Sequence, residues 1–463
     1  MMDKTATNRS SLDTAPVGRL ARRAALAIAC TLASAPMVAA QGQEARTEVR
    51  RLPSVKAETV PTPMPLGEAI SGPSQLDRLI EFAILQHPEL AGARAQVSQE
   101  AGLRFQATRK PNPWFGYSAT EVGNEGRGGQ QGLYVAQEWV TAGKLGLADQ
   151  VGHWKTRAAQ ERAEVARLRV GLRVGTQYWS LVAARHRVEL LRQLEGLLED
   201  AVRINRALQE AAEIERGTLL QAQLEKGQIT AALRQAQAGL RARSAALAAT
   251  LGTDVAFVEG VPSDPWPEPS LPDNSDSPQL GFRIDDQPYA TSPELLVAQA
   301  VLETARWDLR LAETQVVSNV DSYAAVQRDL ATDFTIVSVQ VGMALPLHDR
   351  KSGLVRAARA EIARAEADYA RTYRHLQSRW ADAVGEYRAA WELVTEIEQH
   401  LLRLAEERLE LARRAHGQGE LEYLELLTAQ RSFLAIRQAA IDARQQAAIA
   451  SVRLTQLVVE DQP

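Results

Sequence analysis

A repeat with a constant offset of 207 residues relates the two halves of this 463-residue chain. The segment 213–223 recurs as 420–430, and the same offset carries Lys144 to Lys351 and Arg157 to Arg364. Further upstream, 87–90 corresponds to 292–295 with an offset of 205, so the second half has a small insertion. Two long units that cannot each bury their apolar surface favour an extended assembly over a compact enzyme.

The amino terminus predicts a secretory signal peptide over residues 1–40. Three arginines precede an apolar run from Ala24 to Ala40, and small residues stand before Gln41. A transmembrane anchor is the alternative, but Pro36 shortens the run below the roughly 20 residues that a spanning helix needs. A second alternative is a lipid-attachment cysteine at Cys30.

Charge and cysteine content exclude several classes of function. Cleavage after Ala40 leaves 48 basic and 55 acidic residues, a net charge of about −7, which does not favour nucleic acid. It also removes the only cysteine, so the mature chain has no disulfide and no thiolate metal site. No later segment is apolar for long enough to cross a bilayer as a helix, so strands must make any crossing.

Helical periodicity predicts the same series of helices in each half. Helices are expected at about 75–86 and 88–110, and the Ser292–Pro293–Glu294 start predicts a capped helix in the second half. Very long helices follow at about 144–211 and 353–416, each on the order of 100 Å. Each reverses into a shorter helix that ends near 252 or 459. The long helices carry two apolar seams, at Leu190, Leu194, Leu197, Ala201, Ile204 and Leu208, and at Tyr369, Tyr373, Leu376, Trp380, Ala383 and Tyr387.

Two-residue alternation between these helices predicts two β-hairpins. The strands are expected at about 113–122 and 132–140 in the first half, and at about 317–327 and 334–345 in the second. Valines alternate with polar or small residues from Val337 to Leu345, the clearest strand pattern in the chain. The predicted fold class is therefore helical with membrane β-hairpins, in two tandem repeats.

The division of the chain follows from these patterns. An irregular segment at 41–74 precedes the first repeat, 75–253, and the second repeat occupies 290–459 before a short tail at 460–463. The segment 254–289 between the repeats contains seven prolines and is expected to be a linker or a belt of irregular structure.

Four strands of about ten residues are long enough to span an outer membrane when tilted, but too few to close a barrel. Three copies supply twelve strands, and the helices then continue the wall as a hollow cylinder. Trp139, Trp114 and Tyr117 are candidates for an interfacial aromatic belt.

Three motifs resemble the TolC-like outer membrane efflux proteins. Residues 137–144 resemble the Gly-Lys corner that joins strand to helix in that family, and 344–347 are its counterpart in the second half. Residues 419–430 resemble the periplasmic turn, and the resemblance covers about 75–459. It implies a homotrimer with a 12-stranded β-barrel on a coiled-coil α-helical barrel, located in the outer membrane lipid and extending into the periplasm. It also implies two partners, a periplasmic adaptor protein and an inner-membrane pump.

The resemblance also assigns candidate site residues. Gly143, Lys144 and Pro346 are expected at the strand-to-helix corners. Glu425 falls where the family often has an acidic residue at the periplasmic aperture, whereas Leu421 stands where some members hold a gating arginine. The expected aperture and adaptor contacts are Glu213, Gly217, Gly419, Glu420, Glu422 and Glu425. An ordinary solvated helix position is the alternative for Glu425.

Competing functions predict different properties. A periplasmic adaptor or structural protein without a pore shares the helices, but its strands would pair into a soluble cap. An enzyme is not favoured, because no nucleophile, base and orienting acid are found together, and no cofactor or metal site is expected. Metal ions, drugs and polypeptides all stay open as exported substrates, although the Gly-Lys corner resembles the heavy-metal-exporter branch.

Overall fold

The computed structural model describes residues 74–123, 129–211, 214–267, 288–418 and 421–455. All of them belong to one compact unit, Glu68–Pro463. The predicted signal peptide, Cys30, most of the segment 41–74 and the tail 460–463 lie outside the described residues, as do Glu213, Gly419 and Glu420. Among the helices described, none is long and apolar enough to cross a membrane.

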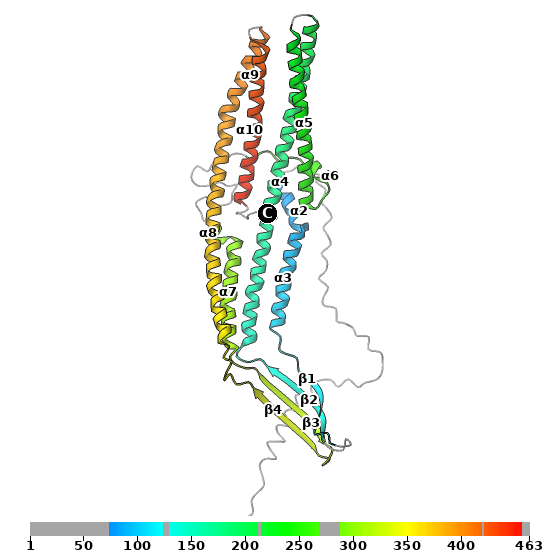
Figure 1. Ribbon diagram of the computed structural model, residues 1–463, viewed down its shortest axis with the longest axis vertical. Coiled ribbons are helices and arrows are strands. Elements are labelled where there is room, and N and C mark those ends of the chain that lie inside the picture. The colour runs from blue at the N-terminus through cyan, green and yellow to red at the C-terminus, as the bar shows by residue number, and fades with distance from the viewer. Residues whose placement is uncertain (1–73, 124–128, 212–213, 268–287, 419–420, 456–463) are drawn as a thin grey trace, which may run out of the picture. The chain divides into compact units, whose positions relative to one another are not determined.

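Long helices make up most of the described residues, and they lie beside one another in Figure 1. The first half contains α2 (Gln75–Gln86), α3 (Pro88–Ala107), α4 (Lys144–Glu210), α5 (Arg216–Leu251) and the short α6 (Val255–Gly260). The second half contains η2 (Pro288–Thr291), α7 (Pro293–Thr314), α8 (Ser352–Glu396), η3 (Ile397–Leu401), α9 (Leu402–Gly417) and α10 (Tyr423–Thr455).

The starts of α3 and α7 are anchored by ion pairs to the long helices. Glu89 accepts from Arg169 at 3.2 Å, and Glu294 accepts from Arg379 at 2.9 Å. Ser292 is the N-cap of α7 as expected, with Pro293 in the first turn, although its side chain makes no capping hydrogen bond. In the first half the Nδ1 atom of His87 accepts from the Glu89 N–H at 3.2 Å.

The second long helix contains a π-helical turn that periodicity did not predict. Ile397–Leu401 forms this turn between α8 and α9. Before it, Val394 and Ile397 are buried, but Leu401 and Leu404, which continue that spacing, are 40% and 56% exposed. The buried positions instead resume one residue later, at 405 and 409. A π turn adds one residue without breaking the helix, so it moves the buried face.

Part of the Pro-containing segment packs into the helical core. Within the expected linker 254–289, α6 buries Val258 completely beside Tyr178. Asp264 donates its N–H to the Tyr178 hydroxyl at 2.7 Å, and its carboxylate accepts from the N–H groups of Gln75 and Leu76, both at 3.0 Å. Burial raises the pKa of Tyr178. This segment therefore caps α2 and fixes it against α4.

Four antiparallel strands form one sheet in the order β1-β2-β3-β4. Their bounds are Trp114–Thr120, Gln130–Trp139, Val320–Asp329 and Thr335–Met343. The third strand begins and ends later than the expected 317–327. Helix α3 ends at Ala107 instead of 110, ahead of Pro111 and Pro113, which cannot continue a helix. The helix-rich chain with a small antiparallel sheet confirms the predicted mixture of helices and strands.

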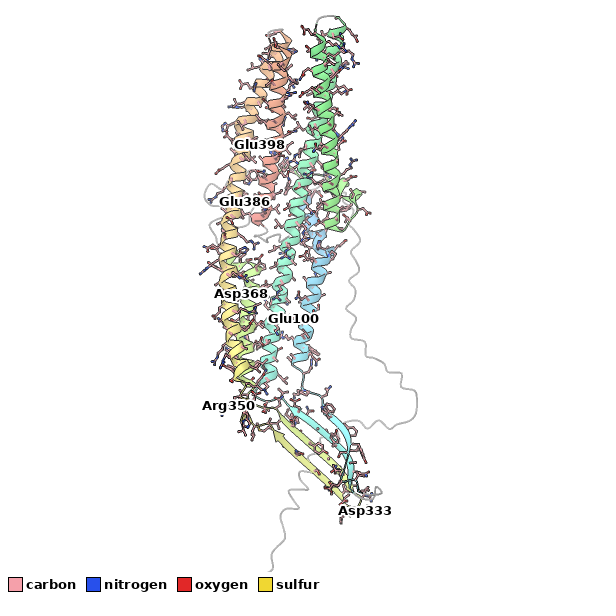
Figure 2. The ribbon with its side chains drawn as sticks, in the orientation of Figure 1. Glu100, Asp333, Arg350, Asp368, Glu386 and Glu398 are labelled. Atoms are coloured by element: carbon pink, nitrogen blue, oxygen red, sulfur yellow. The ribbon has the colours of Figure 1, made fainter. Side chains whose placement is uncertain are left out.

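The two hairpins meet at β2 and β3, which come from different halves of the chain. The β3–β4 turn is closed by Asp333, which has φ 58° and accepts from the Arg328 guanidinium at 2.8 Å. Figure 2 shows Asp333 at the far end of the sheet, whereas Arg350 lies at the junction of sheet and helices. The sheet thus extends away from the helices at one end of this unit (Figure 1).

Asp308 on α7 is an ionisable group whose environment opposes its charge. Burial raises the pKa of this carboxyl and Glu361 adds to the rise, whereas Lys155 partly offsets it. A raised folded pKa means that ionised Asp308 destabilises the fold at neutral pH, and that this effect disappears as pH falls through the folded pKa. Asp308→Asn is therefore expected to raise the unfolding midpoint at pH 7, with a smaller gain at pH 4. Thermal unfolding at pH 7 and pH 4 measures the two midpoints, and Asp382→Asn is the control because Asp382 is exposed. Equal gains in midpoint at the two pH values would contradict this prediction.

Candidate functional site

One face of the sheet is apolar and exposed. The pairing places Val135 opposite Ala324, and Val339 opposite that same residue on the other side. On this face Val339 is 61% exposed and Val341 68%. The other large exposed members are Phe115, Tyr117, Leu133, Trp139, Val326, Val337 and Met343. Contiguous apolar surface of this kind marks a membrane or protein interface.

The opposite face of the sheet is polar and partly covered by its own side chains. Gln327 is only 6% exposed and donates to the Ser118 hydroxyl at 2.7 Å. The rings of Tyr134 and Tyr323 stack with centroids 5.2 Å apart. Trp114 lies on this face because it pairs with Ala136, next to Val135 of the apolar face. The expected place of Trp114 in a belt with Trp139 and Tyr117 is therefore wrong.

Lys144 joins the two halves at the first strand-to-helix corner. Gly143 has φ 67°, a left-handed conformation that glycine adopts without strain, and Lys144 then begins α4. The Lys144 ammonium donates to the Val317 carbonyl at 2.5 Å and to the Asn319 side chain at 2.7 Å. Asn319 in turn donates to Glu138 at 2.6 Å. We call these contacts of Lys144 with Val317 and Asn319 the corner clasp.

The second corner has no such cross-link within the part of the chain that is described. Pro346 is half-buried between the exposed Leu345 and Leu347. Lys351 has φ 55° and its ammonium donates to Asp349 of the same corner at 2.6 Å. This hydrogen bond lowers the pKa of Asp349. Lys351 is thus the sequence counterpart of Lys144, but it is the cap residue before α8, whereas Lys144 is the first residue of α4. Its partner comes from its own turn.

The described tip residues fall at two separate turns. Gly217 is exposed in the first turn of α5, whereas Glu422 and Glu425 are exposed at the start of α10. Figure 1 shows the starts of α5 and α10 at the end of the helices away from the sheet. The Glu422 carbonyl accepts from the Glu425 N–H at 3.1 Å, and the His416 ring lies 2.8 Å from the Leu421 carbonyl oxygen. These contacts fix the start of α10.

The long helices leave an apolar stripe without cover. The expected seam on α4 is only partly buried, because Leu197 and Ile204 are 56% and 57% exposed. Instead α4 packs on α5 through the adjacent positions Val188, Leu191 and Leu198. On α5, Leu220 and Leu224 are also exposed. By contrast, the seam expected on α8 from Leu376 to Tyr387 is buried. Both faces of α4 are apolar, so each requires a partner.

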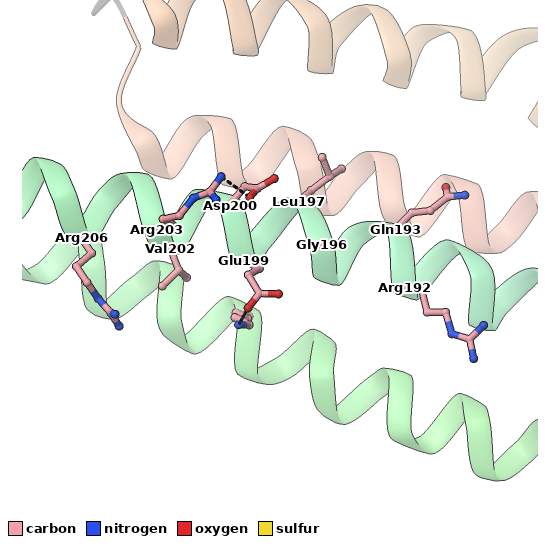
Figure 3. Close-up of a pocket in the computed structure, with 10 residues that line it drawn as sticks. Arg192, Gln193, Gly196, Leu197, Glu199, Asp200, Val202, Arg203 and Arg206 are labelled. Atoms are coloured by element: carbon pink, nitrogen blue, oxygen red, sulfur yellow. Dashed lines mark hydrogen bonds and ion pairs between the residues drawn. The ribbon is translucent and has the colours of Figure 1, made fainter.

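Charged side chains line a shallow groove along α4 and α5. Figure 3 shows Arg203 joined to Asp200, at 2.7 Å, with Arg192 and Arg206 on the same helix. Lys226 of α5 donates to Glu199 at 3.0 Å. Acids and bases alternate here, as in a solvated helix face. Among the described residues no cluster of three or more histidines or acids is placed to hold a metal ion.

An ion pair between a buried glutamate and a half-exposed arginine connects the helical hairpins of the two halves. Glu225 on α5 is only 6% exposed, and the guanidinium of Arg431 on α10 donates to both of its carboxylate oxygens. This hydrogen bonding raises the pKa of Arg431. Sequence periodicity gave no signal for this pair, because the two residues belong to different helices far apart in the chain.

Removing the Arg431 charge tests that connection. Arg431→Gln leaves Glu225 buried without its cation and is expected to cost about 1–3 kcal/mol of folding free energy. The matched control on the same helix is Arg437→Gln, because Arg437 and Glu406 are about half-exposed and 3.8 Å apart. Thermal unfolding followed by circular dichroism compares the two variants. Equal melting temperatures would show that the Glu225 pair does not hold the hairpins together.

Comparison with known proteins identifies this architecture. Residues 287–458 match the family model for outer membrane efflux protein. No curated protein sequence matches the chain. Among solved structures, the outer membrane protein VceC of Vibrio cholerae is 21% identical with a TM-score of 0.66, over 82% of this chain and 96% of its own. A membrane protein from Pseudomonas aeruginosa is 20% identical with a TM-score of 0.69, over 83% and 93%.

A third similar structure is the open state of the MtrE outer membrane channel of Neisseria gonorrhoeae. It is 15% identical, with a TM-score of 0.66 over 83% of this chain and 88% of its own. At these identities the structures show a shared fold. Together with the family model, they confirm the resemblance to the TolC-like outer membrane efflux proteins.

Proposed function

We propose that this chain, an outer membrane efflux protein, is the passive exit duct of a tripartite efflux system. It lies in the outer membrane and extends into the periplasm. An inner-membrane pump and a periplasmic adaptor would deliver the substrate, and the chain itself would carry out no chemistry. The observation that carries this proposal is the sheet with one exposed apolar face and one polar face, because a wall between lipid and water needs that division.

A homotrimer would complete the duct. One copy supplies four strands with two free edges, and three copies would give a closed 12-stranded barrel without edges. The uncovered apolar stripe at Leu197, Ile204, Leu220 and Leu224 supports the same assembly, because neighbouring helices would cover it. The helices would then form a coiled-coil barrel below the sheet.

The proposed division of the chain keeps the boundaries expected from sequence. It comprises a signal peptide, 1–40; an irregular segment, 41–74; a first repeat, 75–253; an equatorial segment, 254–289; a second repeat, 290–459; and the tail. The hydrogen bonds of Asp264 to α2 and Tyr178 support a structural role for the equatorial segment.

The turns at the far end of the helices are the proposed aperture and adaptor contact. This set comprises Glu213, Gly217, Gly419, Glu420, Glu422 and Glu425. Glu422 and Glu425 are exposed at the α10 start, so three copies would place a ring of carboxylates around a narrow opening. Low-dielectric walls would focus the negative potential of such a ring and attract cations.

Glu425→Ala is expected to weaken the block of single-channel current by divalent cations. The physical reason is that the substitution removes one carboxylate per copy from the proposed opening. Glu410→Ala is the control, because Glu410 is also exposed but lies earlier in α9, away from the turn before α10. Identical block curves for wild type and Glu425→Ala would rule out the aperture role.

Extraction and mass together test the proposed duct. We expect the mature protein to fractionate with the outer membrane, to require detergent for extraction, and to have three times the chain mass in detergent. A periplasmic adaptor or structural protein without a pore is the alternative, and it would be extracted without detergent. A water-soluble monomer would therefore overturn the proposal.

A further inference from the structure

The edge strands β1 and β4 are the two ends of the sheet, and each lacks a neighbour on one side within the described residues. The inner pair, β2 and β3, already joins the carboxyl-terminal strand of one hairpin to the amino-terminal strand of the next. Closing a barrel from several copies requires the same kind of junction between β4 and β1. The β2–β3 pair is therefore a template within one chain for the junction between chains.

The repeat relates β1 to β3 by 207 residues. The helices before these strands end at the cap residues Thr108 and Gln315, which differ by that number. Asn112 and Asn319 differ by the same number. The faces agree as well, because Tyr117 and its counterpart Ala324 both lie on the apolar face.

The hairpin pairings relate β2 to β4 by 206 residues, and one added residue after β4 returns the offset to 207 at Lys144 and Lys351. Tyr117 of β1 pairs with Leu133 of β2. Adding 207 to the first number and 206 to the second gives Ala324 and Val339, which are paired in the second hairpin. The same shift carries Trp114 with Ala136 to Asp321 with Gly342, and these are also paired. The two hairpins thus have the same internal register.

Applying the two offsets to the β2–β3 pair gives the register of the missing junction. The first offset carries Leu133 of β2 to Val339 of β4, and the second carries Val326 of β3 back to Ala119 of β1, so the Leu133–Val326 pair predicts a Val339–Ala119 pair. In the same way, the Tyr134–Ala325 pair predicts a Gln340–Ser118 pair. We propose that β4 of one copy pairs with β1 of a neighbouring copy in this register. At the same junction, the side-chain amide oxygen of Asn112 of the neighbouring copy accepts from the Lys351 ammonium, as Asn319 accepts from Lys144.

The chemistry of both edges fits this junction. Val339 and Ala119 continue the apolar face across it, whereas Gln340 and Ser118 continue the polar face. Asn112 is exposed just before β1, and the Lys351 side chain is 40% exposed. The Lys351 ammonium has three donors, of which Asp349 accepts one, so an amide oxygen from a second copy can join it. The contact at Lys351 that corresponds to the corner clasp is therefore complete only when the neighbouring copy supplies Asn112.

This inference rests on the proposed trimer, and disulfide cross-linking tests the register separately. Two double variants, Val339→Cys with Ala119→Cys and Gln340→Cys with Ser118→Cys, are expected to give covalent trimers as the main product in mild oxidant. Within one chain β1 and β4 are separated by three strand spacings, roughly 14 Å. A disulfide needs Cα atoms closer than about 7 Å, so each bond would have to join different copies.

Displaced pairs serve as matched controls. Val341→Cys with Ala119→Cys and Val339→Cys with Tyr117→Cys move the register by two residues in opposite directions. Each shift adds roughly 7 Å along the strand, so both controls are expected to stay uncrosslinked. Trimers that cross-link best in a displaced pair, or in none, would overturn the register while leaving the trimer intact. Monomers in detergent for every variant, and for the wild type, would overturn the trimer and the register together.

The clasp between copies has its own test. Asn112→Ala and Lys351→Ala are each expected to lower the temperature at which detergent-extracted trimers dissociate, and the double variant to be no worse than the more damaging single one. Such non-additivity is the signature of residues in direct contact. Strictly additive effects, or none, would remove the Asn112–Lys351 contact. A gel of unheated and heated samples provides the readout without requiring activity.

Discussion

Replacing Val339 by Arg is expected to abolish accumulation of the protein in the outer membrane. Val339 lies at the middle of β4 on the apolar face and is 61% exposed. An arginine on the lipid-facing side of a membrane strand costs about 2–4 kcal/mol near the midplane. Every copy in a trimer would carry that cost, so insertion is expected to fail.

The neighbouring residue provides the matched control. Gln340 follows Val339 on the same strand but faces the polar side of the sheet, so Gln340→Arg is expected to insert at the wild-type level. Immunoblots of separated inner-membrane, outer-membrane and periplasmic fractions compare the two variants. Equal outer membrane levels for both would mean that the apolar face does not contact lipid.

Gly132→Ala is expected to disrupt the junction between the two halves. A Cβ atom at Gly132 would lie 2.0 Å from the Val326 carbonyl oxygen and 2.5 Å from the Gln327 Cα atom. Both are backbone atoms, so β2 and β3 would have to separate. Overpacking of this kind typically costs 1–3 kcal/mol, and a displaced ladder would cost more. We therefore expect a large loss of folded protein.

Gly342→Ala is the control for that substitution. Gly342 is also a strand glycine on the polar face, but it has open space where a Cβ would lie. Its repeat counterpart in β2 is Ala136, which already carries a Cβ. The yield of folded protein and the heat stability of both variants in detergent are the measurements. If Gly132→Ala were as stable as Gly342→Ala, the close approach of β2 and β3 would be wrong.

The sequence predicts the local elements well because their signals are local. Alternation from Val337 to Met343 fixed the strand and its two faces, and the antiparallel register bears out this division. Pro111 and Pro113 marked the end of α3 to within a few residues. Periodicity predicts a hairpin followed by a long helix in each half, and the structure contains both.

These local signals do not predict contacts between distant segments of the chain. Periodicity identified Leu197 and Ile204 as apolar, but two adjacent faces of α4 are apolar, and spacing alone does not say which one α5 covers. The π turn at Ile397–Leu401 likewise shifts the buried face without any change in composition.

Some candidate site residues could likewise be predicted from local sequence, whereas others could not. The corner residues Gly143 and Lys144 were predicted from a motif, whereas Asn319, which accepts the Lys144 ammonium, follows a non-helical turn without periodicity. The one signal that marks Asn319 is its counterpart Asn112 in the repeat. The tip residues were assigned by resemblance, and their role in the aperture stays a prediction.

Single-channel recording tests the central claim most directly. Detergent-purified mature protein, added to a planar lipid bilayer, is expected to produce discrete, uniform conductance steps that scale with salt concentration. Val339→Arg protein is expected to give no steps. A wild-type protein that extracts as a trimer but never conducts would contradict a water-filled duct built from these sheets and helices.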